Sequence, residues 1–411
     1  MNLRVRGLDP CVHCGFCLQS CPTFLTTGDE ADGPRGRILL MQQLATGRLT
    51  PDEPRLAWHL DRCLGCRACE TVCPSGVAYG SAWEEVRHEL AGLRPLPFTV
   101  RLVNGIMRDS PVRRVGLALA RLVRPVARRF AGGSQLGFAA GMLAATKMPW
   151  DRRNGRSASV HPTTHSVVMF TGCIMEGLFG HVHAATRRVL QINGYTVLSA
   201  GGQQCCGALH LHAGQHAEAV ALARANIEAF AAVPDASSIA VNSAGCGAML
   251  KEYPSLLHGD ALESKAIELA DRVRDVTELL AERGPLAGAP IEMRVAYDPP
   301  CHLLHAQRIV DEPLAVLDSI PGIELTTHAE SALCCGSAGS YSLSEPGLSR
   351  DVLDRKVEAL LAASPDVVAT GNPGCIMQIG AGLLATGSRI SVVHPVELLD
   401  RSYECAGLYD G

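Results

Sequence analysis

Two stretches of this sequence place two cysteines side by side and follow them with glycine: QQCCGALH at residues 203–210 and LCCGSAGS at residues 333–340. Each pair is flanked by one cysteine upstream and one downstream. The two sets are Cys173, Cys205, Cys206 and Cys246, and Cys301, Cys334, Cys335 and Cys375. The intervals are 32 and 40 residues in the first set and 33 and 40 in the second. Because both intervals recur, the C-terminal half is predicted to consist of two copies of one fold.

Short β-branched runs alternate with helical runs in each copy. In the first copy the predicted strands are SVVMFTGC, TVLSAGGQQCC and SIAVNSAGC, and the predicted helices are HVHAATRRVLQINGY and HAEAVALARANIEAFAA. The strands of the second copy are RVAYDPPC, IELTTHAESALCC and DVVATGNPGC. Strands that alternate with helices form parallel α/β sheets, whose sites gather beyond the carboxyl ends of the strands. We therefore expect the four cysteines of each copy to meet at one edge of its sheet.

Near the N-terminus the chain carries two further cysteine quartets with identical spacing. Residues 11–22 read CVHCGFCLQSCP and residues 63–74 read CLGCRACETVCP, and both follow the pattern C-x₂-C-x₂-C-x₃-C-P. Three thiolates at this pitch surround one iron–sulfur cube, and the fourth, carried away by the chain, ligates the other cluster. The prediction is two [4Fe–4S] clusters, one held by Cys11, Cys14, Cys17 and Cys73 and the other by Cys63, Cys66, Cys69 and Cys21.

Zinc is the rival metal, because four thiolates suit it as well. Zinc sites, however, usually pair two Cys-x₂-Cys knuckles rather than two interleaved quartets, so the spacing favours iron–sulfur clusters. A zinc-stabilised interaction scaffold remains the alternative from another functional class.

The adjacent cysteines of the C-terminal half are interpreted as ligands too. A disulfide between neighbours strains the backbone, whereas a pair supplies two thiolates from one tight loop, and Gly207 or Gly336 lets the chain turn close to them. One or two further [4Fe–4S] clusters are therefore expected. Two alternatives stay open: the cysteines are buried apolar residues, or the copies have diverged and only one keeps a cluster.

Seventeen cysteines in a chain of 411 residues indicate metal binding or redox chemistry in a reducing compartment. The start of the chain, MNLRVRGLDPC, shows no signal peptide, and no apolar run reaches the roughly 18 residues of a confident membrane span. A cytoplasmic location is therefore expected. The net charge of −4 gives no global basic field, so no nucleic-acid partner is expected.

Between the quartets, DGPRGRILLMQQLATGRL and EPRLAWHLDRC have apolar residues at helical intervals. An insertion of this length does not fit a compact bacterial ferredoxin hairpin. It resembles the helical ferredoxin module of succinate dehydrogenase-type iron–sulfur subunits. For Arg35 and Arg37, a role near a reduced cluster or a partner competes with a solvated or structural role.

The paired Cys…CCG…Cys units resemble the cysteine-rich CCG domains of heterodisulfide reductase subunits and of several respiratory oxidoreductases. With the N-terminal quartets, nearly the whole chain resembles the family of iron–sulfur subunits of bacterial glycolate oxidase. The matching stretches are CVHCGFC, GDEADGPRGRI, HLDRCLGCRACETVCPSGV, SAGCGAMLKEY and LCCGSAGSYSL. Iron–sulfur subunits of L-lactate oxidation and of anaerobic glycerol-3-phosphate dehydrogenase share the architecture, so they are alternatives for the substrate.

The resemblance implies an electron-transfer subunit of an oxidoreductase, without catalytic residues of its own. Separate FAD-containing catalytic subunits would oxidise glycolate to glyoxylate, and this chain would pass the electrons along its clusters towards quinone. The chain has no GxGxxG after a predicted strand, so no flavin is expected on it.

One departure from the wider CCG family concerns chemistry. Heterodisulfide reductase units end in C-x₂-C and hold an unusual cluster with five cysteines, but here the first of those positions is Ser243 in one copy and Asn372 in the other. Each copy offers four thiolates, enough for one cubane. An independent disulfide reductase is therefore disfavoured.

The segment from Arg94 to Phe130 carries nine arginines and one acid, interleaved with leucine and valine. Such a basic amphipathic stretch suits an anionic membrane surface, and the alternative is a linker or a helix packed on a partner. We expect a peripheral position on the cytoplasmic face of the inner membrane, mediated by Arg113, Arg114, Arg121 and Arg124.

The predicted domains are a two-cluster ferredoxin domain (1–93), a basic connector (94–160) and two CCG domains (161–290 and 291–411). Four histidines fall near the cysteines: His210, His212, His302 and His305. Each is a candidate for tuning a cluster or relaying a proton, and a structural role is the competing interpretation.

Overall fold

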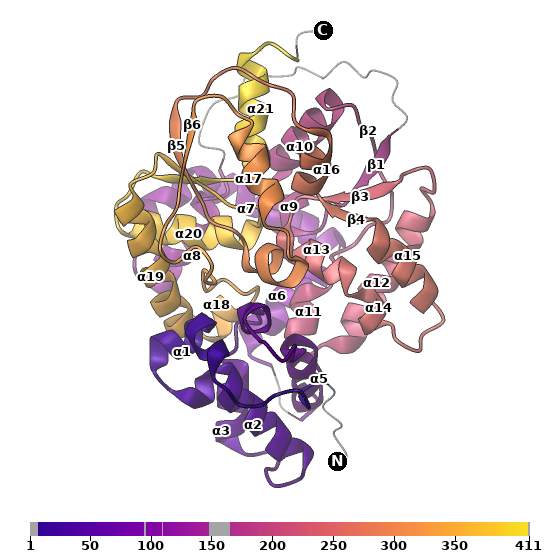
Figure 1. Cartoon of the computed structure of the whole chain (residues 1–411), viewed down its shortest axis with the longest axis vertical. Helices are drawn as coiled ribbons and strands as arrows, with labels where there is room; N and C mark the ends of the chain where they lie inside the picture. The colour runs from indigo at the N-terminus through magenta and orange to yellow at the C-terminus, as the bar shows by residue number, and fades with distance from the viewer. Residues whose placement is uncertain (1–6, 94–95, 109, 148–164, 410–411) are drawn as a thin grey trace.

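The computed structural model describes residues 7–93, 96–108, 110–147 and 165–409. Its C-terminal half contains two parallel sheets of the same design, and its N-terminal part is helical, as the sequence predicts (Figure 1). The first sheet has the strand order β2-β1-β3-β4 and the second β6-β5-β7-β8. The matching orders confirm the duplication.

The first sheet consists of β1 (Ser166–Met169), β2 (Thr196–Leu198), β3 (Ser238–Val241) and β4 (Val273–Asp275). All its strand pairs are parallel. The helices between and after them are α9 (Ile174–Leu178), α10 (Gly180–Ile192), α11 (Ala208–His212), α12 (His216–Ala231), α13 (Ala244–Lys251), α14 (Tyr253–Leu256), α15 (Glu263–Arg272) and α16 (Val276–Arg283).

The second sheet repeats the plan with β5 (Met293–Tyr297), β6 (Ile323–Thr326), β7 (Val367–Ala369) and β8 (Ser391–Val393). Its helices are α17 (Asp311–Asp318), α18 (Tyr341–Ser344), α19 (Pro346–Ala363), α20 (Pro373–Ala385) and α21 (Pro395–Cys405), and a π-helix covers His302–Gln307. The sequence pattern missed the fourth strand of each sheet, because three residues are too few to show a periodicity.

A single hydrophobic core runs through both halves. Its buried residues extend from Met107 and Leu117 in the segment before β1 to Tyr409 beyond α21. Ion pairing also joins the halves, since Arg188 of α10 donates two hydrogen bonds of 2.9 and 2.7 Å to the Asp400 carboxylate of α21. The two CCG units therefore form one body, with their cysteine-bearing loops facing the N-terminal part.

The N-terminal part is built from short helices around the two quartets. They are α1 (Pro22–Thr27), α2 (Pro34–Ala45), α3 (Pro54–Asp61), α4 (Ala68–Thr71) and α5 (Tyr79–Ala91), with 3-10 turns at Phe16–Ser20 and Glu30–Asp32. A small core of Met41, Leu60 and Val86 joins α2, α3 and α5. The helices between the quartets confirm the helical ferredoxin prediction.

The connector is helical as well. It contains α6 (Phe98–Arg108), α7 (Ser110–Ala127), a 3-10 turn (Arg128–Phe130) and α8 (Gln135–Ala144). Helix α8 packs on α20, where Gly141 approaches Ala381 so closely that an added Cβ would lie 3.2 Å from the Ala381 Cβ. Within the described residues, no helix is both long and apolar enough to cross a membrane.

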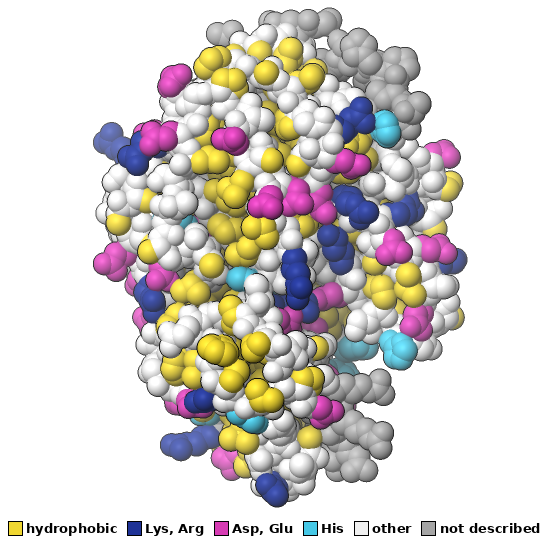
Figure 2. Space-filling model, viewed as in Figure 1, with side chains coloured by type: hydrophobic (Ala, Val, Ile, Leu, Met, Phe, Trp, Pro, Cys, Tyr) yellow, Lys and Arg dark blue, Asp and Glu magenta, His cyan; other side chains and the backbone are white. Residues whose placement is uncertain are grey.

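Charge is mixed over the face seen in Figure 2, where acidic and basic side chains alternate over the CCG units. Hydrophobic side chains gather lower down, over the N-terminal helices. Exposed large apolar residues of this part are Val12, Phe16, Leu39, Trp58 and Val72. The N-terminal part thus exposes several large apolar side chains to solvent.

Candidate functional site

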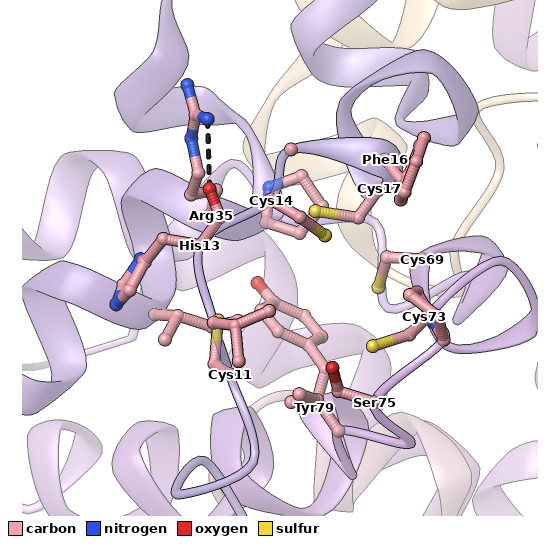
Figure 3. Close-up of a pocket in the computed structure, with 16 residues that line it drawn as sticks. Cys11, His13, Cys14, Phe16, Cys17, Arg35, Cys69, Cys73, Ser75 and Tyr79 are labelled. Carbon is pink, nitrogen blue, oxygen red and sulfur yellow. Dashed lines mark hydrogen bonds between the residues drawn. The ribbon is translucent and has the colours of Figure 1, made fainter.

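The first quartet lines a hollow at the surface of the N-terminal part (Figure 3). Five cysteine side chains surround it: Cys11, Cys14, Cys17, Cys69 and Cys73. Four of them are the residues predicted for the first cluster, and Cys73 comes from the second quartet, as interleaving requires. We call this hollow site 1.

The second quartet lines an adjoining hollow, site 2. Its cysteines are Cys21, Cys63, Cys66 and Cys69, which are the four predicted for the second cluster. Cys69 borders both hollows, so the two sites are neighbours. The structure brings both predicted sets together; that they bind clusters stays a prediction.

The two quartets adopt the same loop conformation. Left-handed backbone occurs at His13 and Gly15 in the first loop, and at Gly65 and Arg67 in the second. These are the second residue after the first cysteine and the residue after the second cysteine in each loop. The repeated positive φ angles curl each Cys-x₂-Cys-x₂-Cys stretch, so that its thiols face one centre.

The donor set of both hollows fits iron–sulfur clusters. Among the residues that line them there is no carboxylate, whereas Arg35 borders site 1, and Arg37 and Arg67 border site 2. Thiolates are the ligands of cubane clusters. Cations without carboxylates suit the negative charge that a cluster with four thiolates carries.

Arg37 is a buried structural residue of site 2. Its side chain donates hydrogen bonds to the carbonyl of His59 (2.8 Å) and to Oγ1 of Thr23 (3.1 Å). The Thr23 hydroxyl in turn lies 3.2 Å from Sγ of Cys21. Arg37 therefore reaches a predicted ligand through one hydroxyl, and its role is both structural and electrostatic. Arg35 instead pairs with Glu30 and donates to the carbonyl of His13 at 3.2 Å (Figure 3).

Burial makes the thiols of the N-terminal sites hard to ionise without a bound metal. It raises the pKa of Cys17 to about 11, and it raises the pKa values of Cys66 and Cys69 as well. Such a thiol binds a metal as the thiolate, so metal binding releases its proton. The buried hydroxyl of Tyr79 lies 3.5 Å from Sγ of Cys63 and donates to it.

The four cysteines of each CCG unit meet beyond the carboxyl ends of their strands. In the first unit Cys173 lies 3.4 Å from Cys205 (Sγ to Sγ), and the thiols of Cys206 and Cys246 lie close enough to shift the pKa values of this pair.

The second unit has the same succession. Cys301 lies 3.8 Å from Cys334 (Sγ to Sγ), and the thiols of Cys335 and Cys375 lie close enough to interact electrostatically with this group. The identical order in both units places each predicted set in one group, which is what ligation of a cluster needs.

Hydrogen bonding between thiols also selects which of them ionise first. In the first unit the hydrogen bond from Cys173 is the main cause of a lowered pKa at Cys205. In the second unit hydrogen bonding with Cys334 is the main cause of the lowered pKa values of Cys301 and Cys335. The thiolate is the form that binds metal, so each unit holds at least one thiol prepared for ligation.

The glycine after each pair has the backbone that the sequence argument requires. The φ angle is +96° at Gly207 and +83° at Gly336. At Gly336 a Cβ would lie 2.5 Å from the carbonyl oxygen of Ser349. Only glycine combines the positive φ with this close approach, so it fixes the loop that turns both thiols inward.

The cysteine sites lie next to one another along the molecule. Cys66 of site 2 packs in one hydrophobic cluster with Cys334, and Cys301 borders the same cluster. Site 2 is therefore the neighbour of the second CCG unit. A second link joins Thr71 of α4 to His305, with 3.0 Å between Oγ1 and Nδ1.

Asn372 connects the two CCG units. Its Nδ2 donates to Sγ of Cys375 (3.4 Å), and its Oδ1 accepts from the backbone N–H of Gly245 (3.2 Å), the residue before Cys246. Ser243 donates to the same oxygen at 3.5 Å. The two positions at which heterodisulfide reductase units carry a fifth cysteine thus bond to each other and bridge the units.

The histidines singled out in the sequence lie between the sites. His302 Nδ1 lies 3.5 Å from Sγ of Cys301, and its ring is 5.8 Å from the ring of His212 in the other unit. His210 is buried, with Nε2 3.2 Å from the carbonyl oxygen of Asn104. His305 bonds to the Ala332 carbonyl at 2.8 Å. His212 Nδ1 lies 3.3 Å from Oε1 of Glu84, so all four histidines have a partner in the fold.

The sequence patterns did not identify the residues that pack next to each cysteine pair. In the first unit Asn226 donates to the carbonyl of Cys205 at 3.0 Å and to Tyr253, whose hydroxyl donates to the carbonyl of Cys206 at 2.9 Å. In the second unit the buried Lys356 forms an ion pair with Asp298 instead. The duplicated spacing gives no signal for this difference.

Comparison with known proteins agrees with this arrangement. Residues 7–77 match the 4Fe-4S dicluster domain family, and residues 167–251 and 295–380 match the cysteine-rich CCG domain family. The glycolate oxidase iron-sulfur subunit of Escherichia coli K12 is 37% identical over 97% of this chain and 94% of its own length.

Two further relatives set the range of the comparison. A probable glycolate oxidase iron-sulfur subunit of Bacillus subtilis 168 is 35% identical over 95% of this chain and 92% of its own length. Lactate utilization protein A of Geobacillus kaustophilus is 30% identical, but over only 57% of this chain and 98% of its own length.

The fold and its sites define an iron–sulfur electron-transfer subunit, with a dicluster ferredoxin domain and two CCG domains. Within that class, the chain belongs to the family of glycolate oxidase iron–sulfur subunits.

Proposed function

We propose that this chain carries electrons from flavin-containing catalytic subunits of a glycolate oxidase complex towards quinone. The observation that carries the proposal is the contiguity of the four cysteine sites. Site 1 and site 2 share Cys69, site 2 packs on the second CCG unit through Cys66, and Asn372 joins the two units. Contiguous sites are what an electron path through one chain needs.

The proposed ligands are the sixteen cysteines that the structure groups. Iron–sulfur clusters would supply one-electron carriers there. Site 1 takes Cys11, Cys14, Cys17 and Cys73; site 2 takes Cys63, Cys66, Cys69 and Cys21. The CCG units take Cys173, Cys205, Cys206 and Cys246, and Cys301, Cys334, Cys335 and Cys375. The division into residues 1–93, 94–160, 161–290 and 291–411 belongs to the same proposal.

The residues around these sites would tune the potentials. Hydrogen bonds to cysteine sulfur and nearby charge are the protein's main means of doing so. Tyr79 supplies a hydrogen bond at Cys63, and Asn372 supplies one at Cys375. In the second CCG unit the cysteine pair lies near the buried ion pair of Lys356 and Asp298. In the first unit the neutral side chain of Asn226 donates to the Cys205 carbonyl.

Glycolate is the proposed substrate of the partner subunits because the relatives named for it cover almost the whole chain. The relative named for lactate utilization covers little more than half of it. L-lactate and glycerol-3-phosphate complexes remain the second candidates. Oxidation of the hydroxyl carbon would take place on the FAD-containing partner, with no flavin on this chain.

A peripheral position at the membrane is the proposed location, because α7 carries an apolar exposed face. Val112, Val115, Leu119, Leu122, Val123 and Val126 are all exposed at helical intervals. Arg114 and Arg121 are exposed beside this face. Such a helix lies on an anionic bilayer with its apolar face inward.

Two of the four arginines expected to contact the membrane do not face solvent. The side chain of Arg113 is buried and donates to the carbonyl of Met107 at 2.8 Å. Arg124 is half-buried and donates to the carbonyl of Thr146 at 3.3 Å. Their guanidinium groups donate to backbone carbonyls at the ends of neighbouring helices. Arg114 and Arg121 are therefore the proposed membrane contacts.

The test is anaerobic addition of glycolate to this chain co-purified with its catalytic subunits. The visible absorbance of the iron–sulfur clusters should bleach with glycolate, and L-lactate and glycerol-3-phosphate should bleach it more slowly. A colourless, zinc-containing protein would favour the scaffold alternative. A coloured protein that only L-lactate reduces would move the proposal to a lactate complex.

A further inference from the structure

A cavity of about 250 Å³ lies where the N-terminal part, the connector and both CCG units meet. The lining residues come from α3 (Ala57, Asp61), α5 (Arg87, Leu90, Ala91), the start of the connector (Leu96, Pro97, Val100), the turn after α11 (Ala213) and α18 with its flanks (Ser340, Ser344, Glu345). Domain junctions are a usual place for a small-molecule ligand.

The walls of this cavity are linked to site 2 through neighbouring residues. Asp61, which lines the cavity, precedes Cys63 by two residues. Tyr341 of α18, next to the lining residue Ser340, donates to the carbonyl of Arg62 at 3.0 Å and packs in the hydrophobic cluster that contains Cys66 and Cys334. Residues that line or adjoin the cavity therefore reach two of the cysteine sites.

The lining combines an apolar wall with hydrogen-bonding groups. Leu90, Leu96 and Val100 supply the apolar part. Arg87 and Ser344 supply donors, and Asp61 and Glu345 supply carboxyl groups. Arg87 lies over the ring of Trp83 (5.0 Å) and 3.5 Å from Asp61, so its position is fixed. A flat apolar ring with carbonyl oxygens at opposite ends is complementary to such a lining.

Apolar side chains are exposed next to the connector residues that line the cavity. Phe98, next to Pro97 in the sequence, is 74% exposed, and Leu102 one turn later on α6 is 51% exposed. Helix α6 packs against α7, the helix with the exposed apolar face. The hydrocarbon tail of a ligand would lie along these residues. From there it would extend directly into a bilayer that contacts α7.

We propose that this cavity binds the head group of a membrane quinone, which accepts the electrons here; the proposal rests on the electron-transfer function proposed above. Iron–sulfur clusters held by the cysteine sites would supply two electrons, which with two protons would convert the two C=O groups of the quinone into the C–OH groups of a quinol. The electrons originate from the hydroxyacid that the partner subunits oxidise. Water at the open mouth supplies the protons.

Glu345 lines the cavity and is the proposed relay for those protons. Burial raises the pKa of its carboxyl group, which keeps a proton on it at a higher pH than usual. The charged groups around it are Arg62, Asp61, Asp32 and Arg87. The arginines oppose this shift and the two aspartates reinforce it.

The binding claim is tested on the full chain with a short-chain benzoquinone that carries a photoreactive azide. Illumination should label peptides that contain Leu96–Val100 or Ser340–Glu345, and an excess of the unmodified quinone should remove the label. Labelling confined to other peptides, or labelling that the excess does not remove, would overturn the assignment. This experiment requires no catalytic subunit, so it stands apart from the glycolate test.

The functional claim is tested in the complex with Ser344→Trp, which fills the cavity from its rim. We expect the rate of quinone reduction to fall about tenfold or more, which corresponds to about 1.4 kcal/mol of lost binding. Reduction of a soluble dye should stay within about twofold, a change too small to count as lost binding.

Leu343→Trp is the matched control. It lies on the same helix, is exposed and is absent from the cavity lining, so both of its rates should stay normal. Unchanged quinone reduction in Ser344→Trp, or an equal loss of quinone and dye reduction, would contradict the proposal. Failure of the unmodified complex to reduce the dye would instead refute the electron-transfer function.

Discussion

The hydroxyl group of Tyr341 donates a hydrogen bond of 3.0 Å to the carbonyl oxygen of Arg62. This contact joins residues 279 positions apart in the chain and ties the second CCG unit to the residue that directly precedes Cys63. The contact is one of the polar links between the N-terminal part and the second unit, beside that of Thr71 to His305.

Tyr341→Phe should therefore loosen the junction between the N-terminal part and the second unit. The partly buried carbonyl of Arg62 loses its donor, which costs about 1 kcal/mol. Amide hydrogen exchange should become faster in residues 57–64 and 338–345. Tyr195→Phe is the control, because it removes a similar hydroxyl bond of 2.8 Å to the Leu279 carbonyl far from site 2. Equal protection at residues 57–64 in both variants would refute the role of this contact.

The two glycines after the cysteine pairs should respond differently to alanine. Gly336→Ala adds both a left-handed backbone cost of about 1–3 kcal/mol and a Cβ placed 2.5 Å from the Ser349 carbonyl oxygen. In Gly207→Ala the nearest atom is 3.4 Å away, so only the backbone cost applies. We expect Gly336→Ala to lose more stability in urea unfolding. An equal loss in both variants would show that the Ser349 contact is easily relieved.

The exposed arginines of α7 should control binding to anionic vesicles. In Arg114→Glu/Arg121→Glu, co-sedimentation with phosphatidylserine-containing vesicles should fall, since each basic residue near the surface contributes about 1 kcal/mol. The control is Lys265→Glu/Arg389→Glu, which makes the same charge change at exposed positions outside the connector. Equal retention of both variants on the vesicles would remove the membrane role. Arg113→Ala should instead lower the stability of the protein, since that side chain is buried.

Two adjacent groups at the start of α21 give opposite contributions to the pH dependence of stability. Burial lowers the pKa of His394 from 6.5 to about 3, so the unfolded chain binds the proton first and stability falls as the pH drops below 6.5. Burial raises the pKa of Glu397 from 4.5 to about 7, so the folded chain binds the proton first and stability rises as the pH drops below 7. Between 4.5 and 6.5 the two contributions offset each other.

His394→Asn should reveal the contribution of Glu397. Asparagine can still accept the hydrogen bond from the Val396 N–H that His394 accepts at 3.2 Å, but it does not titrate. The variant should gain up to about 1.4 kcal/mol of stability per unit of falling pH relative to the native protein in this window. Urea unfolding of the anaerobic protein measures it, and parallel pH profiles would contradict the assignment.

The cysteine sites were predictable from sequence because ligand spacing is local and repeats. The pitch of Cys11, Cys14 and Cys17, and the recurring 40-residue interval before Cys246 and Cys375, are enough to group the thiols. Parallel sheets then followed from the alternation of strands and helices. The structure agrees with both.

The sequence patterns could not predict contacts between segments that are distant in the chain. The bond of Tyr341 to Arg62, the pair of Lys356 and Asp298, and the inward turn of Arg113 each depend on how helices pack, and sequence periodicity carries no information on that. In α7 the arginines alternate with apolar residues, so the pattern gives an amphipathic helix but not which arginine meets a buried carbonyl.

The most direct test of the account is the content of iron and acid-labile sulfide per chain in anaerobically purified protein. If all four cysteine sites hold clusters, about 16 irons and an equal amount of sulfide are expected, since each cubane contributes about 4. Cys335→Ser in the second unit should lower the iron by about 4 and leave the other sites filled. A native value near 8 irons would contradict the central claim, because the electron path would then end in the N-terminal part.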